Sequence, residues 1–262
     1  MRSSNPLTCP TCMLLSKWQL TIINDTAASG SWEGEFMTTT SKMSQIRSHD
    51  GFNLGAYQAQ PEGEVKGAVV VIQEIFGVNG HIREVVDGYA AAGYFAIAPQ
   101  IFDRIERDIE LGYEAEDMGR GIELAFQKLD RKLTLQDLQA TIEVASSYGK
   151  VGVVGYCFGG LLTWLSACEL TGVSAASAYY GGGVAGEVER SAKCPVMMHF
   201  GELDAHIPLS DVEQVRAAQP GVQVFVYPAD HGFNCDHRAS YDAQAAALAK
   251  ERTLALFAEH LS

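Results

Sequence analysis

One cysteine of this sequence has the flanking residues that a catalytic nucleophile needs. Cys157 lies in the segment Gly155-Tyr156-Cys157-Phe158-Gly159-Gly160, directly after the valine-rich run 151–154. This Gly-x-Cys-x-Gly spacing matches the nucleophile elbow, a tight strand-to-helix turn, with sulfur in place of the usual serine oxygen. The flanking glycines let strand and helix approach, and the N-terminus of a helix favours a thiolate over a thiol. We therefore predict that Cys157 is a nucleophile. The alternatives are a buried structural cysteine and a phosphate-binding loop, although the glycines do not form G-x-G-x-x-G.

A thiolate nucleophile needs a base and an acid that orients the base, and two later segments supply both. Asp204 ends the segment Gly201-Glu202-Leu203-Asp204, and His231 lies in Asp230-His231-Gly232-Phe233. Each segment follows a predicted strand, and the order nucleophile, acid, histidine is the one that α/β-hydrolase topology imposes. For two rivals in these loops, His206 and Asp230, we expect surface salt links. His199 lies within a strand, where a hydrogen-bonded core histidine is expected.

An earlier loop, Gln73-Glu74-Ile75-Phe76-Gly77, follows the first predicted core strand. In this topology an oxyanion hole takes one backbone N–H from the residue after the nucleophile, here Phe158, and one from such an early loop, here Ile75. Glu74 brings a carboxylate into the same corner. The alternative for Glu74 is a solvated loop acid.

The elements that must position these residues alternate between strand and helix. Short apolar runs predict strands over 67–72, 94–98, 151–154, 174–180, 196–200 and 222–227, and amphipathic spacing predicts helices over 81–92, 135–148, 159–170, 210–218 and 240–261. Ser210 and Glu213 have the spacing of a capping box. Repeated alternation predicts an α/β fold with a mainly parallel sheet between two layers of helices, in which reactive groups gather at the carboxyl ends of the strands. We predict one domain over 44–262 and a disordered extension over 1–43.

Composition excludes several other classes of function. The 262 residues are 47% hydrophobic and carry a net charge of −13, and Lys and Arg form no cluster. We therefore expect neither a nucleic-acid partner nor a membrane-surface partner, and no run of 18 apolar residues predicts a spanning helix. A small-molecule substrate is the expected partner, and the sequence does not assign an oligomeric state.

The cysteines and histidines outside these loops predict no cofactor or metal. The six cysteines have no disulfide-framework spacing, so we expect free thiols in a reducing, cytoplasmic compartment; they are Cys9, Cys12, Cys157, Cys168, Cys194 and Cys235. The segment 12–23 is interrupted by polar residues and is a poor signal peptide. Cys9-Pro-Thr-Cys12 lacks the second ligand pair that zinc needs and the βαβ unit that a redox motif needs. The remaining histidines show no spacing typical of metal ligands; they are His49, His81, His237 and His260.

Taken together, the four motif segments 73–77, 155–160, 201–204 and 230–233 resemble those of the dienelactone hydrolase family, the carboxymethylenebutenolidases. The resemblance covers about residues 45–261. It implies Cys157 as nucleophile, His231 as base and Asp204 as orienting acid, with the N–H groups of Ile75 and Phe158 as the oxyanion hole. It also implies that Glu74 holds the resting thiol and takes its proton when substrate binds.

The sequence departs from the family at its substrate-binding arginines. Four residues after the histidine, where the best-known family member has an arginine, this chain has Cys235, and a second arginine position aligns with Gly119, one place before Arg120. Arg104, Arg120 and Arg238 are candidate partners for a substrate anion. The alternative for each is a solvated surface arginine.

The chemistry of a sulfur nucleophile limits the range of expected substrates. A thiolate leaves a tetrahedral adduct more readily than an alkoxide or an amine, so the adduct reverts unless the other leaving group is also stabilised. Enol lactones and aryl esters, which release an enolate or a phenolate, are therefore the expected substrates of a Cys-His-Asp triad with a thioester intermediate. The alternatives are a broad carboxylesterase of the same fold, a ligand-binding scaffold without turnover, and a thiol redox protein.

Overall fold

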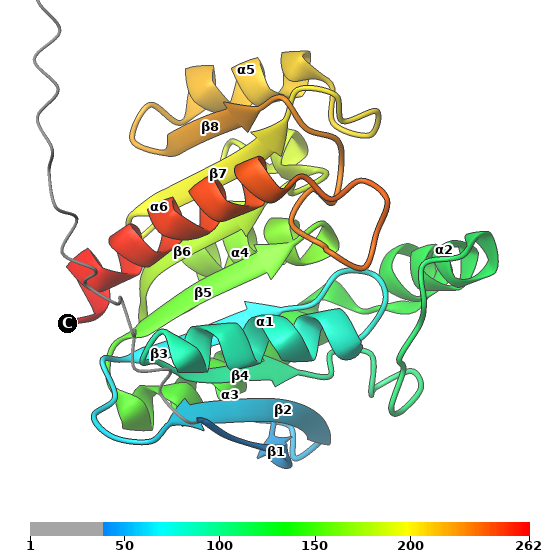
Figure 1. Ribbon diagram of the computed structural model, residues 1–262. Helices are drawn as coiled ribbons and strands as arrows, with labels where there is room; N and C mark the ends of the chain where they lie inside the picture. The colour runs from blue at the N-terminus through cyan, green and yellow to red at the C-terminus, as the bar shows by residue number, and fades with distance from the viewer. Residues whose placement is uncertain (1–38) are drawn as a thin grey trace, which may run out of the picture. The chain divides into compact units, whose positions relative to one another are not determined.

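The computed structural model describes residues 39–262, which form one eight-stranded sheet with helices on both of its faces (Figure 1). The strands are β1 (Thr39–Arg47), β2 (Asn53–Pro61), β3 (Ala68–Ile72), β4 (Phe95–Pro99), β5 (Val151–Tyr156), β6 (Val173–Tyr179), β7 (Val196–Gly201) and β8 (Gln223–Tyr227). Their order across the sheet is β1-β2-β4-β3-β5-β6-β7-β8. The first two strand pairs, β1 with β2 and β2 with β4, are antiparallel, and all the others are parallel.

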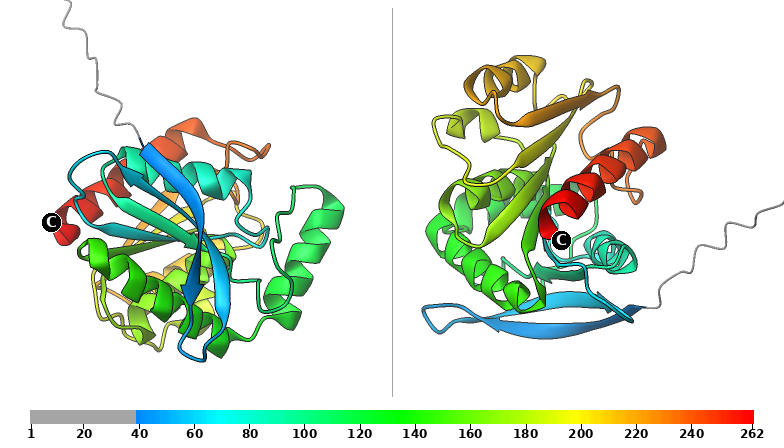
Figure 2. Two further views of the ribbon diagram at one scale, coloured as in Figure 1. Left: turned by 90° about the horizontal axis from the view of Figure 1, so that it is seen from below. Right: turned by 90° about the vertical axis from the view of Figure 1, so that its left-hand side faces the viewer.

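The helices form two layers. They are α1 (Gly80–Ala91), α2 (Ala115–Ile122), α3 (Arg131–Ala145), α4 (Phe158–Glu169), α5 (Leu209–Ala218) and α6 (Ala243–Leu261), with a π-helical turn over Glu123–Lys128 and short 3-10 turns over Ser146–Tyr148 and Val184–Glu187. Both α1 and α6 cover one face of the sheet, whereas α3 and α4 cover the other (Figures 1 and 2). The central strands β3, β4 and β5 are buried between them, as the α/β prediction requires.

Burial explains why the central strands are apolar throughout. Every residue of β3, β4 and β5 is buried, because a parallel strand covered on both faces has no solvent side. By contrast β1 is largely exposed and belongs to a hairpin at the edge of the sheet opposite β8 (Figure 2). Among the described residues, no helix is long and apolar enough to cross a membrane.

All the predicted strands and helices are present, with shifts at their ends. The predicted capping box is wrong: Ser210 lies inside α5, which follows Pro208 and has no side-chain cap. The cap of α3 is Asp130, whose carboxylate accepts a hydrogen bond from the N–H of Leu133 (3.0 Å), so this helix begins four residues before the predicted Leu135.

The predicted boundary at residue 43 is also displaced. Residues 39–43 belong to β1, where Thr39 pairs with Pro61 and Met43 with Tyr57, so they are part of the sheet rather than of an extension. The Cys9–Cys12 motif, the apolar segment 12–23 and the rest of the predicted extension lie outside the described residues.

Candidate active site

Cys157 lies in the tight turn between β5 and α4, where an elbow was predicted. Its backbone has φ 55° and ψ −116°, a region that side-chain-bearing residues rarely adopt. Such strain costs on the order of 1–3 kcal/mol and occurs at functional sites. A Cβ atom on Gly155 would lie 2.1 Å from the Gly159 carbonyl oxygen, and one on Gly159 would lie 2.4 Å from that of Ile72. The two flanking glycines are therefore required by the close approach of strand and helix.

Asp204 and His231 meet at the same edge of the sheet. Asp204 follows β7 and His231 follows β8, and Nδ1 of His231 lies 2.7 Å from Oδ2 of Asp204. The other carboxylate oxygen of Asp204 accepts hydrogen bonds from the backbone N–H groups of His206 (2.8 Å) and Ile207 (3.1 Å). Because both oxygens of this buried carboxylate are engaged, Asp204 fixes the orientation of the imidazole.

The side chain of Cys157 also acts on the imidazole of His231. Since Nδ1 is bound to Asp204, Nε2 is the ring nitrogen that remains for Cys157. Burial by itself lowers the pKa of His231, but its hydrogen bonds to Asp204 and Cys157, together with the charges on both partners, outweigh burial and raise the pKa to about 10. His231 is thus hydrogen-bonded to Asp204 and interacts with Cys157.

His231 is expected to keep both ring protons up to about pH 10 in the free protein. Because its folded-state pKa is raised, the stability that this group contributes is fully present below about pH 6.5 and is lost as pH rises toward 10. NMR titration of histidine-labelled protein measures this pKa, and Cys157→Ala should lower it by removing one partner. His199 is an internal control, because burial and the charge of Arg252 lower its pKa to about 3. A wild-type midpoint near 6.5 for His231 would contradict the expectation.

Glu74 is completely buried, so the alternative of a solvated loop acid is wrong. Within residues 39–262, neither of its carboxylate oxygens has a hydrogen-bond partner, and its ion pair is with Nη1 of Arg238 at 3.6 Å. Arg238 in turn lies over the rings of Phe76 and Tyr113. After burial, the charge of Glu74 is the largest cause that raises the pKa of Tyr113. A buried carboxylate without hydrogen bonds requires a functional explanation.

A cavity of about 430 Å³ opens at Cys157. Its wall is mostly apolar and comes from the 73–77 loop, α2, the π-helical turn and α4; the apolar side chains are Ile75, Phe76, Met118, Ile122, Phe126, Phe158 and Leu161. Its polar side chains are His206, His231, Arg131, Glu187 and Arg238. The two residues expected to supply oxyanion donors, Ile75 and Phe158, both line this cavity. The N–H of Phe158 is in the first turn of α4, where no preceding helical carbonyl can accept it.

Only one of the three candidate arginines reaches the cavity. Arg104 donates two hydrogen bonds to Asp137, each of 2.7 Å, and two more to Asp50, and it does not line the cavity. Arg120 pairs with Glu106 and Glu123 and is likewise outside it. For these two residues the substrate-binding expectation does not fit the structure, whereas Arg238 lines the cavity.

The structure adds Arg131, which sequence reasoning missed. Arg131 begins α3 and lines the cavity, where its Nη1 lies 2.6 Å from Oε1 of Glu187. No sequence motif identifies Arg131, because its position at the cavity depends on how α2 and the π-helical turn before it fold.

Three further residues near the strand ends, His199, His206 and Asp230, have other partners. His199 is a core histidine, as predicted, and bonds to Tyr227 (2.8 Å) and Thr253 (3.2 Å). The expected salt link of His206 is absent among the described residues, and its ring instead lies 5.3 Å from that of His231. Asp230 likewise accepts a hydrogen bond from the backbone N–H of His231 (2.6 Å) in place of a salt link.

The four described cysteines are free thiols; they are Cys157, Cys168, Cys194 and Cys235. Burial raises the pKa of Cys168, Cys194 and Cys235 to about 11. Cys235 also donates a hydrogen bond to the Tyr113 hydroxyl (3.3 Å). Among these four thiols, only Cys157 lines the cavity.

The strand order and the elbow are those of an α/β hydrolase, and comparison with known proteins specifies the family. The model of the dienelactone hydrolase family matches residues 54–261. A Synechocystis sp. protein provisionally named carboxymethylenebutenolidase is 38% identical over 81% of this chain and 94% of its own length. The carboxymethylenebutenolidase of Pseudomonas putida is 35% identical over 80% of this chain and 92% of its own length. A crystal structure from Klebsiella pneumoniae, provisionally named dienelactone hydrolase, superposes with a TM-score of 0.75 at 31% identity, covering 85% of this chain and all of that one.

The chain therefore belongs to the dienelactone hydrolase family. It is a carboxylic ester hydrolase similar to carboxymethylenebutenolidases.

Proposed function

We propose that this protein hydrolyses an enol lactone, or another ester with an equally good leaving group, through a thioester on Cys157. The observation that carries the proposal is that Cys157 and His231 line the same mostly apolar cavity, with His231 hydrogen-bonded to Asp204 at 2.7 Å. A nucleophile, a base and an orienting acid in this arrangement are the parts that acyl transfer requires.

The first half of the cycle forms the acyl-enzyme. The Cys157 thiolate attacks the ester carbonyl, and the N–H groups of Ile75 and Phe158 stabilise the oxyanion. Collapse of the tetrahedral adduct breaks the bond to the enol oxygen, which leaves as an enolate and takes a proton from the His231 imidazolium. The product of this step is a neutral thioester and a neutral imidazole.

The second half of the cycle depends on a change in the pKa of His231. In the free protein its raised pKa rests partly on the hydrogen bond and charge of Cys157. Acylation removes both contributions, so the pKa of His231 falls and the neutral ring can take a proton from water. The resulting hydroxide adds to the thioester, and the Cys157 thiolate then leaves with the imidazolium again beside it.

Glu74 has a place in this cycle before the first attack. It is a buried carboxylate without a hydrogen bond among the described residues, and it directly precedes Ile75 in the same loop. When the resting sulfur carries a proton, Glu74 accepts that proton as substrate enters. A protonated Glu74 would also relieve the desolvation that full burial imposes on the carboxylate.

The acyl-enzyme is expected to accumulate with p-nitrophenyl acetate. We expect a burst of nitrophenolate that approaches one equivalent of protein, and a covalent acetyl group on the peptide containing Cys157 by mass spectrometry of acid-quenched protein. Iodoacetamide should abolish the burst. Binding of lactones without any hydrolysis would favour the scaffold alternative, and acetyl groups on other residues only would contradict the proposed nucleophile.

Arg238 is proposed as the partner of a substrate carboxylate. It is the one candidate of the three that lines the cavity, and its side chain is largely covered by Phe76 and Tyr113. Since a hydrogen bond to a charged group contributes roughly 1.5–3 kcal/mol, Arg238→Gln should raise KM for a carboxylate-bearing lactone about 10- to 100-fold. KM for a neutral aryl ester should change much less.

The matched control for this experiment is Arg131→Gln. Arg131 also lines the cavity, but its guanidinium is paired with Glu187 at 2.6 Å. We expect this variant to bind both substrates like the wild type. The assignment of Arg238 would be wrong if Arg131→Gln, rather than Arg238→Gln, raised KM for the carboxylate-bearing lactone without raising KM for the neutral ester.

A further inference from the structure

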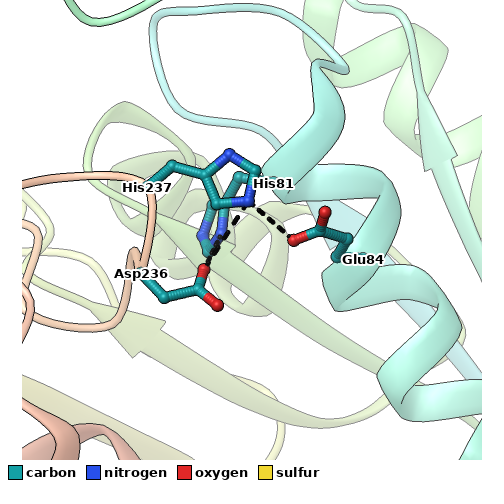
Figure 3. Close-up of side chains that lie close together, drawn as sticks. All are labelled: His81, Glu84, Asp236 and His237. Atoms are coloured by element: carbon teal, nitrogen blue, oxygen red, sulfur yellow. Dashed lines mark hydrogen bonds and ion pairs between the residues drawn. The ribbon is translucent and has the colours of Figure 1, made fainter.

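Four side chains typical of metal ligands meet away from the active-site cavity (Figure 3). His81 and Glu84 lie on α1, and Asp236 and His237 lie in the loop before α6. One ligand atom from each lies within 4.8 Å of all the others. Spacing along the sequence did not predict this group, because its halves are about 150 residues apart.

We propose that these four side chains bind a divalent transition-metal ion of the Zn²⁺ class. Two imidazole nitrogens and two carboxylate oxygens are a ligand set that suits zinc and its neighbours in the first transition row. With neutral imidazoles, the two carboxylates match the charge of a divalent ion.

The separations of the ligand atoms lie near those that a shared ion requires, and none exceeds 4.8 Å. Oδ1 of Asp236 lies 3.3 Å from Nδ1 of His81 and 3.9 Å from Nε2 of His237, both longer than a good hydrogen bond. Bonds of 2.0–2.1 Å to a tetrahedral ion place its ligand atoms about 3.3–3.4 Å from one another. One contact is shorter, the 2.8 Å hydrogen bond between His237 and Glu84, and it must open by a few tenths of an ångström.

In the part of the chain that the structure describes, neither Glu84 nor Asp236 forms a salt bridge with a lysine or an arginine, and Lys250 lines the cavity beside them without such a bond. His81 is buried, and its Nε2 has no hydrogen-bond partner there either. A cavity of about 240 Å³ lies beside His81, Glu84 and Asp236 and gives an ion access from solvent.

The backbone holds the two halves of the group in place. His81 and Glu84 are three residues apart, so they lie on one face of α1, and Asn79 caps this helix by accepting a hydrogen bond from the N–H of Ile82 (3.3 Å). Asp236 and His237 lie between His231 and Arg238 in the same loop. A bound ion would therefore tie the loop that carries the catalytic histidine to α1.

Zinc binding by the full chain tests this proposal. The protein is stripped with a chelator, its accessible thiols are blocked with iodoacetamide, and Zn²⁺ is titrated against a chromophoric competitor. We expect the wild type to bind one Zn²⁺ ion. Glu84→Gln and His237→Asn should each bind it at least about tenfold more weakly, since even loss of an outer-shell partner lowers metal affinity 10–100-fold. Both positions are substantially exposed, so these substitutions spare the core.

The control variant is His49→Asn. His49 forms the same kind of exposed pair, 2.8 Å from Glu143, but belongs to no larger ligand group in residues 39–262. It should bind Zn²⁺ like the wild type. Zn²⁺ should also raise the Tm of the wild type and of His49→Asn, and raise it much less for the two ligand variants.

Co²⁺ provides an independent readout of the ligands. The thiol-blocked wild type should give the visible absorption of a tetrahedral cobalt site without sulfur ligands, and His237→Asn should lose it. If thiol-blocked wild type binds no Zn²⁺ at micromolar protein, or if the ligand variants bind it as tightly as the wild type, the proposal is overturned and the four residues form hydrogen-bonded pairs only.

Discussion

Cys157→Ala is expected to lower kcat for an enol lactone by about 10⁵- to 10⁶-fold, in line with the loss of a triad nucleophile in other hydrolases. The methyl group cannot form a thioester, so only the cavity and the oxyanion donors remain to act on an attacking water. Steady-state hydrolysis, followed by the absorbance of the released enol, measures the loss. Lactone binding itself should persist, because the remaining cavity wall is unchanged.

A second thiol variant separates loss of the proposed nucleophile from a general loss of folding. Cys194→Ala removes a partly buried thiol outside the cavity, whose pKa burial raises to about 11. It should retain wild-type kcat. Turnover by Cys157→Ala within tenfold of the wild type would mean that another residue attacks the ester, and the proposed cycle would fail.

Asp204→Asn is expected to lower kcat by about 10⁴-fold with little change in KM. The carboxylate holds Nδ1 of His231 as the donor at 2.7 Å and leaves Nε2 to face sulfur. An amide can present its NH₂ group to Nδ1 instead, and once acylation has made the ring neutral this stabilises the tautomer that has its proton on Nε2. The pKa of His231 should also fall, because both the hydrogen bond and the charge of Asp204 raise it.

The matched control is Asp230→Asn, the same change one residue from His231. Within the described part of the chain, the Asp230 carboxylate accepts a hydrogen bond from the backbone N–H of His231, and asparagine keeps an oxygen that can accept it. We expect kcat within a few-fold of the wild type. Equal losses in the two variants would indicate that the loop, rather than the orientation of the ring, limits the reaction.

The sequence predicted the parallel part of the fold because burial leaves a clear signal there. Strands such as β3 and β5 are apolar at every position, and the helices between them have a regular apolar stripe. The loops that follow these strands therefore identified the edge where Cys157, Asp204 and His231 meet.

Elements with mixed exposure gave no comparable signal. In β1 most residues are exposed and only Ile46 is buried hydrophobic, so its residues resemble an extension until their pairing with β2 is seen. The π-helical turn over Glu123–Lys128 places Phe126 at the cavity, and its irregular spacing fits no helical or strand period. The candidate Arg104 was misassigned because the carboxylates that bind it, Asp50 and Asp137, are distant in sequence.

The left-handed backbone at Cys157 has a consequence for engineering. Glycine would adopt that conformation without steric strain, so a substitution that relieves strain in the turn would also remove the sulfur on which the proposed cycle depends. At this one residue, the stability of the fold and the proposed reactivity of the sulfur require different side chains. Selection for heat resistance alone would drift toward inactive proteins here, and thermostable versions that still work must gain their stability elsewhere.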